Sequence, residues 1–177
     1  MVALHEKNIE HRDLKTENCL VEVKHGQYRA KIADFGLSKS KALVTHSTSR
    51  NSSGTRTHQA PEILLPPEGA TERSDEDRQK SDVYSYGIVM YEVLSRKKPF
   101  QELTDETQIA VAVLHGRRPS PIPSDIPPKL VELMEQCWQH DTARRPNFQT
   151  IVRTLRHLLP SPVHVEVETP NPALLRS

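Results

Sequence analysis

This sequence contains little cysteine, no long apolar run and almost no excess of charge of one sign. Its two cysteines, Cys19 and Cys137, form no C-x-x-C pair, so a disulfide framework or a cysteine zinc site has no support. The formal net charge of +1 argues against nucleic acid or an anionic membrane as a partner. The longest apolar runs are too short to cross a bilayer, and the N-terminus lacks the apolar core of a signal peptide. We therefore expect a cytoplasmic protein without a membrane segment.

Proline is plentiful by contrast, and its distribution indicates where the ordered elements lie. Most of the 14 prolines fall in residues 64–70, 117–128 and 159–175, which we interpret as linkers and a tail. Between these stretches apolar residues recur at spacings of three and four, which is typical of helices packed on a core. The predicted helices span about Lys80–Ser95, Ile109–Leu114, Leu130–Trp138 and Phe148–Leu159.

One region has a different pattern. Residues 18–23 and 28–34 contain alternating or β-branched side chains on either side of a turn with one glycine, which predicts a short β-hairpin. Residues 38–57 are dense in Ser, Thr and Lys without periodicity, and we expect a long exposed loop there. The sequence thus predicts an α+β fold, a mostly helical body with one small hairpin.

The stretch HRDLKTENCL, residues 11–20, places the cations Arg12 and Lys15 close to the carboxylate of Asp13 and the amide of Asn18. Asp34 opens the tripeptide DFG where the second predicted strand ends, so the two ends of the hairpin can bring Asn18 and Asp34 together. Such oxygen ligands suit Mg²⁺. A carboxylate at Asp13 can accept the proton of an attacking hydroxyl, and Lys15 can neutralise a phosphoryl group in transfer. The set indicates phosphoryl transfer.

The motifs HRDLKTEN, DFG and APE, in this order, resemble the signature of eukaryotic protein kinases. Two later stretches, SDVYSYGIVMYEVLSRKKPF from Ser81 and CWQHDTARRP from Cys137, resemble large-lobe helices of the tyrosine-kinase-like group. The resemblance implies a protein-kinase-like fold in which a helical C-terminal lobe carries the catalytic and DFG segments on a short hairpin. It places a kinase domain over residues 1–159, followed by a flexible Pro-rich tail over residues 160–177.

The resemblance also implies an activity and its residues. The expected reaction is transfer of the ATP γ-phosphoryl group to Ser or Thr hydroxyls of a protein substrate, with ATP and Mg²⁺ as cofactors. Asp13 corresponds to the catalytic base, Asn18 and Asp34 to the Mg²⁺ ligands, and Lys15 to the charge partner of the phosphate. Lys15 and Thr55, which precedes APE, are features of serine/threonine kinases, and we expect both in the catalytic site.

Arg12, before the catalytic Asp, implies a kinase switched by loop phosphorylation, by an activating kinase or by itself, because a guanidinium can bind a phosphate bidentately. The candidate acceptors are Ser47, Thr48, Ser49, Ser52 and Ser53. Glu62 and Arg145 correspond to a buried ion pair of the family. Asp82 corresponds to an acid that binds the catalytic-loop backbone, although an acid near a helix start is also typical of an N-cap.

Some residues depart from the family pattern or invite another interpretation. Glu10 stands where the family usually has Ile or Val, and His58 and Gln59 stand where it usually has Tyr and Met. Residues 66–79 resemble a polar surface insertion. The spacing of His5, His11 and His58 fits no zinc motif, and we expect Trp138 and Phe148 to be core residues.

Only ten residues precede His11, and they contain no glycine-rich loop, strand lysine or helix glutamate. In the family these elements form the small lobe, which holds ATP from above. The chain therefore resembles a large lobe with the N-terminal lobe absent. Two functions remain open: a fragment of an active serine/threonine kinase, or a non-catalytic, pseudokinase-like binding module or scaffold.

We expect the 177-residue chain alone to show at most trace kinase activity and weak Mg²⁺–ATP binding. The reason is that the residues which would cover the adenine are missing from it. Transfer of radiolabelled γ-phosphate to a protein acceptor measures the activity. Robust transfer by the purified chain that Asp13→Asn abolishes would contradict this expectation.

Overall fold

The computed structural model describes residues 1–24, 27–34, 39–40, 56–66 and 75–158. Its α-helices are α1 (Val2–His5), α2 (Pro61–Leu64), α3 (Asp75–Ser95), α4 (Glu106–Leu114), α5 (Pro128–Cys137) and α6 (Phe148–Leu158). Three short 3-10 helices are η1 (Thr16–Asn18), η3 (Arg56–His58) and η4 (Thr142–Arg144). Two antiparallel strand pairs join β1 (Ile9–Glu10) to β4 (Lys39–Ser40) and β2 (Cys19–Lys24) to β3 (Gln27–Ile32).

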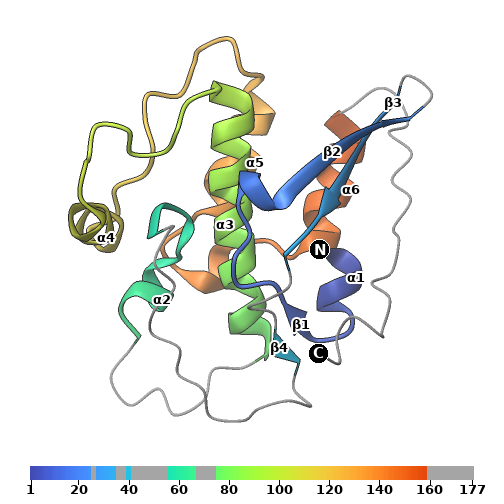
Figure 1. The fold of residues 1–177 in the computed structure, drawn as a ribbon, viewed down its shortest axis with the longest axis horizontal. Helices are drawn as coiled ribbons and strands as arrows, with labels where there is room; N and C mark the ends of the chain where they lie inside the picture. Colours follow the sequence, from blue (N-terminus) through green and yellow to red (C-terminus); the bar gives the residue numbers. More distant parts are fainter. Residues whose placement is uncertain (25–26, 35–38, 41–55, 67–74, 159–177) are drawn as a thin grey trace.

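The predicted hairpin is confirmed as β2 and β3. Its register runs from the pair Cys19 and Ile32 at the base to Lys24 and Gln27 at the tip. In Figure 1 the hairpin projects from the helical body. This arrangement places residues 18 and 33, just outside the paired strands, side by side at the base.

Large apolar side chains of the hairpin are exposed. On β2, Leu20, Val21 and Val23 are 56%, 64% and 62% exposed, and Tyr28 on β3 is 74% exposed. Because neighbouring residues of a strand point to opposite faces, Leu20 and Val21 show that neither face is covered within the described part of the chain.

Helix α3 forms the centre of the fold, as Figure 1 shows. Tyr84 and Ile88 are fully buried, which suits a helix surrounded by other elements. At Gly87 an added Cβ would lie 3.1 Å from Cβ of Cys137 and 3.2 Å from Cβ of Trp138, so the absence of a side chain lets the end of α5 approach α3 closely. The expected core residues Trp138 and Phe148 are each 5% exposed, which confirms their prediction.

The structure corrects the helix starts. Helix α3 begins at Asp75 rather than about Lys80, so the supposed insertion of residues 66–79 is partly helical. Helix α4 begins at Glu106 rather than Ile109, because the carboxylate of Asp105 accepts a hydrogen bond from the backbone N–H of Thr107 at 3.0 Å and caps the helix. Apolar spacing cannot reveal a polar first turn, so both helices were predicted to start several residues after their true first residue.

The other two predicted helices are confirmed within two residues at each end, as α5 and α6. Most of the predicted loop over residues 38–57 lies outside the described residues, but residues 39–40 pair with β1, so the loop prediction is wrong there. Within the described ranges, every helix is too short or too polar to cross a lipid bilayer.

The two thiols should react at different rates in the folded chain. Burial raises the pKa of Cys137 to about 12, and burial together with Glu17 raises the pKa of the half-buried Cys19. Because the thiolate is the reactive form, at about pH 8 iodoacetamide should modify Cys19 slowly and leave Cys137 unmodified. Mass spectrometry with and without urea tests this. Rapid labelling of Cys137 without urea would contradict the packing of α5 on α3.

Candidate active site

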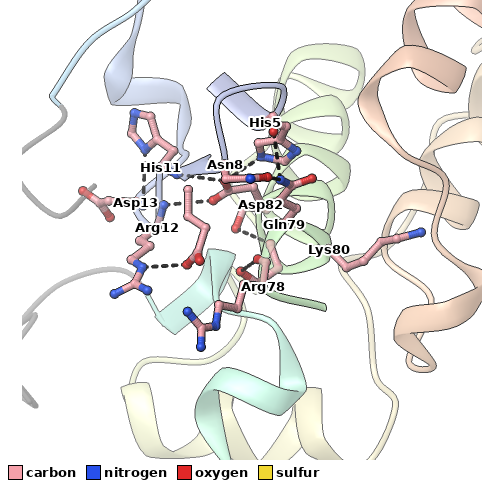
Figure 2. Close-up of polar contacts among 12 residues, drawn as sticks. His5, Asn8, His11, Arg12, Asp13, Arg78, Gln79, Lys80 and Asp82 are labelled. Carbon is pink, nitrogen blue, oxygen red and sulfur yellow. Dashed lines mark hydrogen bonds and ion pairs between the residues drawn. The ribbon is translucent and has the colours of Figure 1, made fainter. Parts of the chain in front are cut away.

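The carboxylate of Asp82 holds the backbone of the HRD segment. Its Oδ2 accepts a hydrogen bond from the N–H of His11 at 2.8 Å, and its Oδ1 accepts one from the N–H of Arg12 at 2.9 Å (Figure 2). Asp82 is 1% exposed and lies inside α3 rather than at its start. The N-cap interpretation is therefore wrong, and the contact with the loop backbone is confirmed.

His5 belongs to the same network. Its Nε2 lies 3.0 Å from Oδ2 of Asp82, and its carbonyl accepts a hydrogen bond from the side-chain amide of Gln79 at 3.0 Å (Figure 2). Its ring also contacts the ring edge of Phe148, at 5.0 Å between centroids. The sequence analysis weighed His5 only as a metal ligand and missed this role, because His5 and Asp82 are too far apart in sequence for any spacing rule.

His11 connects the HRD segment to the end of β3. Its Nε2 lies 3.1 Å from the carbonyl oxygen of Ala33, and its Nδ1 lies 3.3 Å from the backbone nitrogen of Asp13. With Nδ1 accepting from Asp13, Nε2 carries the proton and donates to Ala33. His11 is fully buried, so both ring nitrogens act inside the protein.

Three of the predicted catalytic residues meet. The ammonium of Lys15 lies 2.9 Å from Oδ2 of Asp13. The amide nitrogen of Asn18 donates to the carbonyl oxygen of Asp13 at 2.8 Å and to its Oδ2 at 3.1 Å. The side chains of Asp13 and Lys15 are 21% and 19% exposed, so the carboxylate is held in place yet reachable from solvent.

Asn18 and Asp34 lie at one end of the hairpin, as predicted. The N–H of Ala33 donates to the carbonyl oxygen of Asn18 at 2.8 Å, and Asp34 follows directly. The backbone of Asp34 is left-handed, with φ of 62°, a conformation that costs energy for any residue with a side chain and is frequent at functional sites. Thr55 lies outside the described residues.

The donor set at this end of the hairpin suits Mg²⁺. The amide nitrogen of Asn18 is used in binding Asp13, which leaves its amide oxygen as the atom for a cation, next to the segment that bears the Asp34 carboxylate. Mg²⁺ prefers such oxygens and keeps several waters, so two protein ligands suffice. Clusters of three or more His, Cys, Asp or Glu able to bind a metal do not occur among the described residues.

Arg12 has a partner that the sequence analysis did not foresee. Its Nε donates to Oε2 of Glu10 at 2.8 Å, and Glu10 is 8% exposed. The residue noted as a departure from the family pattern is thus a counter-ion for the HRD arginine. The backbone of Arg12 is also left-handed, with φ of 69°. The five predicted phosphate acceptors lie outside the described residues.

The predicted ion pair between Glu62 and Arg145 is confirmed. It is bidentate, with Nη1–Oε1 at 2.7 Å and Nη2–Oε2 at 2.8 Å, and Arg145 is 1% exposed. Nε of Arg145 also donates to the carbonyl of Gln139 at 2.8 Å, and Nη1 to that of Lys80 at 2.9 Å. One guanidinium therefore fixes α2, and with it the APE motif, to α3 and the segment before α6.

Comparison with known proteins gives a consistent family. The chain matches the sequence model described as protein tyrosine and serine/threonine kinase over residues 1–155. It is 40% identical over 159 residues to Serine/threonine-protein kinase STY46 of Arabidopsis thaliana, a match that covers 89% of this chain and 25% of the relative. It is 37% identical over 162 residues to Serine/threonine-protein kinase CTR1 of the same plant, covering 90% and 18%.

A third relative is Dual specificity protein kinase shkC of Dictyostelium discoideum, 39% identical over 165 residues, which cover 88% of this chain and 29% of the relative. The chain therefore spans less than a third of the length of each of these proteins.

Asp82→Asn tests whether the Asp82 carboxylate holds the backbone of the HRD segment. The amide would present a donor where the carboxylate has an acceptor, so a buried backbone N–H of His11 or Arg12 would lose its partner. We expect the free energy of unfolding to fall by about 2–3 kcal/mol, measured in urea. Asp105→Asn is the matched control, because Asn caps a helix as well as Asp does. Equal stability of the two variants would refute the anchoring role.

Proposed function

The chain belongs to the family of protein tyrosine and serine/threonine kinases, and we propose that its described residues form the catalytic site of a serine/threonine kinase. The proposed reaction is transfer of the ATP γ-phosphoryl group to Ser or Thr hydroxyls of a protein. The observation that supports it best is the meeting of Asp13, Lys15 and Asn18 around one carboxylate.

Asp13 is proposed as the catalytic base. A base must reach the substrate hydroxyl and hold a fixed direction. The contacts from Lys15 and Asn18 restrict the Asp13 side chain, and its partial exposure leaves it accessible. The ammonium of Lys15 sits beside the carboxylate, where it can offset the negative charge of the phosphoryl group as the hydroxyl attacks.

Asn18 and Asp34 are proposed to hold Mg²⁺, through the amide oxygen and the carboxylate. Bound there with ATP, the ion would offset charge on the phosphates. The chain itself places both ligands at one end of the hairpin. One of them, Asn18, contacts the proposed catalytic base, Asp13. The backbone hydrogen bond that Ala33 donates to Asn18 and the left-handed φ of Asp34 support that placement.

The preference for Ser and Thr rests on two observations. Lys15 occupies a position that is typical of serine/threonine kinases, and two of the relatives carry that name. Phosphorylation of the chain, by another kinase or by itself, and a protein substrate are further parts of the proposal. A cytoplasmic location is proposed because both Cys19 and Cys137 are free thiols, which suit a reducing compartment.

The second candidate, a non-catalytic binding module, is favoured by one observation. Val21, Val23 and Tyr28, the cross-strand partner of Val23, are exposed apolar side chains on one face of the hairpin, and exposed apolar patches often mark contact surfaces. The intact set of polar contacts around Asp13 favours catalysis instead, since binding through the hairpin needs none of them.

Asp13→Asn in the natural protein that carries these residues separates the two candidates. Loss of the base should lower kcat by about 100-fold or more and leave the KM for ATP within a few-fold. Phosphorylation of a generic protein acceptor gives both constants. Asp141→Asn, an exposed cap of η4, should be neutral. A wild-type natural protein that transfers no phosphate would favour the binding module.

A further inference from the structure

Three polar side chains from segments that are distant in sequence meet next to the HRD segment. The hydroxyl of Thr16, in η1, donates to Oε2 of Glu92, in α3, at 2.5 Å. Nε2 of His58, in η3, lies 3.3 Å from the same oxygen. The Thr16 hydroxyl also lies 3.3 Å from Oε2 of Glu17, but one proton serves one acceptor, and the Glu92 contact is the shorter.

The side chains of His58 and Glu92 are largely shielded from solvent. His58 is 5% exposed, and among the described residues its Nε2 has no hydrogen-bond partner of good geometry, only the adjacent carboxylate. Burial raises the pKa of Glu92, but contacts from His58 and Thr16 and the charges of His58 and Lys98 outweigh it, so the pKa lies below its ordinary value. Glu92 is therefore a carboxylate at neutral pH, and because its side chain is only 13% exposed, the two neighbouring side chains replace much of its contact with water.

The three segments are fixed by further contacts. Thr16 follows Lys15, whose ammonium contacts Asp13. On the other side, the hydroxyl of Ser85 donates to the carbonyl of His58 at 2.8 Å, so η3 is bound to α3 by its backbone as well as by its imidazole. Nδ1 of His58 lies 2.9 Å from the hydroxyl of Thr57, so both ring nitrogens face oxygens.

We propose that Thr16, His58 and Glu92 are positioning residues that couple the segment before Ala60 to the catalytic loop. Glu92 receives the Thr16 hydroxyl on one side and His58 on the other, so the backbone beside Lys15 is placed correctly only when η3 is in place. The inference rests on the proposed function, because Lys15 and Asp13 give the coupling its catalytic meaning. It extends that function by linking order in η3 to the geometry of the base.

The test is NMR of the isotopically labelled chain, which requires no phosphoryl transfer. Thr16→Val keeps the shape of the side chain and removes the donor, whereas Thr16→Ser keeps the donor. Thr16→Val should shift the amide resonances of both Lys15 and His58, and Thr16→Ser should leave both close to wild type. Thr107→Val, at an exposed site on α4, is the control and should shift neither.

Glu92→Gln provides a second, independent variant, because it preserves the shape and removes the charge that faces His58. It should shift the same two resonances. In the natural protein, Thr16→Val should lower kcat about tenfold with the KM for ATP nearly unchanged, since small misplacement of a reacting group costs rate rather than binding.

The coupling is overturned if Thr16→Val shifts Lys15 but not His58, or if Thr16→Ser shifts both as strongly as Thr16→Val. The first result would confine Thr16 to its own loop, and the second would show that packing, not the hydrogen bond, is responsible. Failure of the proposed function looks different: the NMR coupling would persist while the wild-type natural protein transferred no phosphate.

Discussion

The carboxylate of Asp82 is the interaction on which the site depends. Two consecutive backbone N–H groups, of His11 and Arg12, point at its two oxygens, and a buried N–H without a partner costs about 1–3 kcal/mol. Arg12 is also left-handed, a conformation that persists only when its surroundings hold it. Because Asp13 is the next residue, the direction of the proposed base follows from a side chain about 70 residues away.

Side chains of helix α3 also hold two other segments in place. Asp82 holds the HRD backbone, Ser85 holds η3, and Glu92 holds η1. A buried helix is rigid and rises about 1.5 Å per residue, so the positions of the three anchors along it set the relative positions of the segments. The proposed phosphoryl transfer would require groups that are in place beforehand, and a single helix would supply that preorganisation.

The sequence predicted what is encoded locally. The hairpin and the buried faces of the helices follow from apolar periods, and Asp13, Lys15 and Asn18 could be grouped because they are neighbours along the chain. The contacts of His5 with Asp82 and of Thr16 with Glu92 join residues more than 70 positions apart, which no local pattern relates. The family resemblance predicted the distant pair of Glu62 and Arg145 but not these two contacts. Polar residues in the interior also follow no period, so His11 and Asp82, 0% and 1% exposed, cannot be told from surface residues by hydropathy.

Glu10 shows how a departure from a family pattern can be explained physically. A buried carboxylate in place of an apolar residue would be costly if it were unpaired, but the Glu10 carboxylate binds the Arg12 guanidinium, next to the loop that pairs Lys15 with Asp13. Each of these two cations in the HRD stretch thus has a carboxylate partner supplied by the described residues themselves. The loop therefore needs no bound nucleotide to balance these charges. Placing the proposed catalytic groups and placing ATP would then be separate tasks, and contacts among the described residues account for the first.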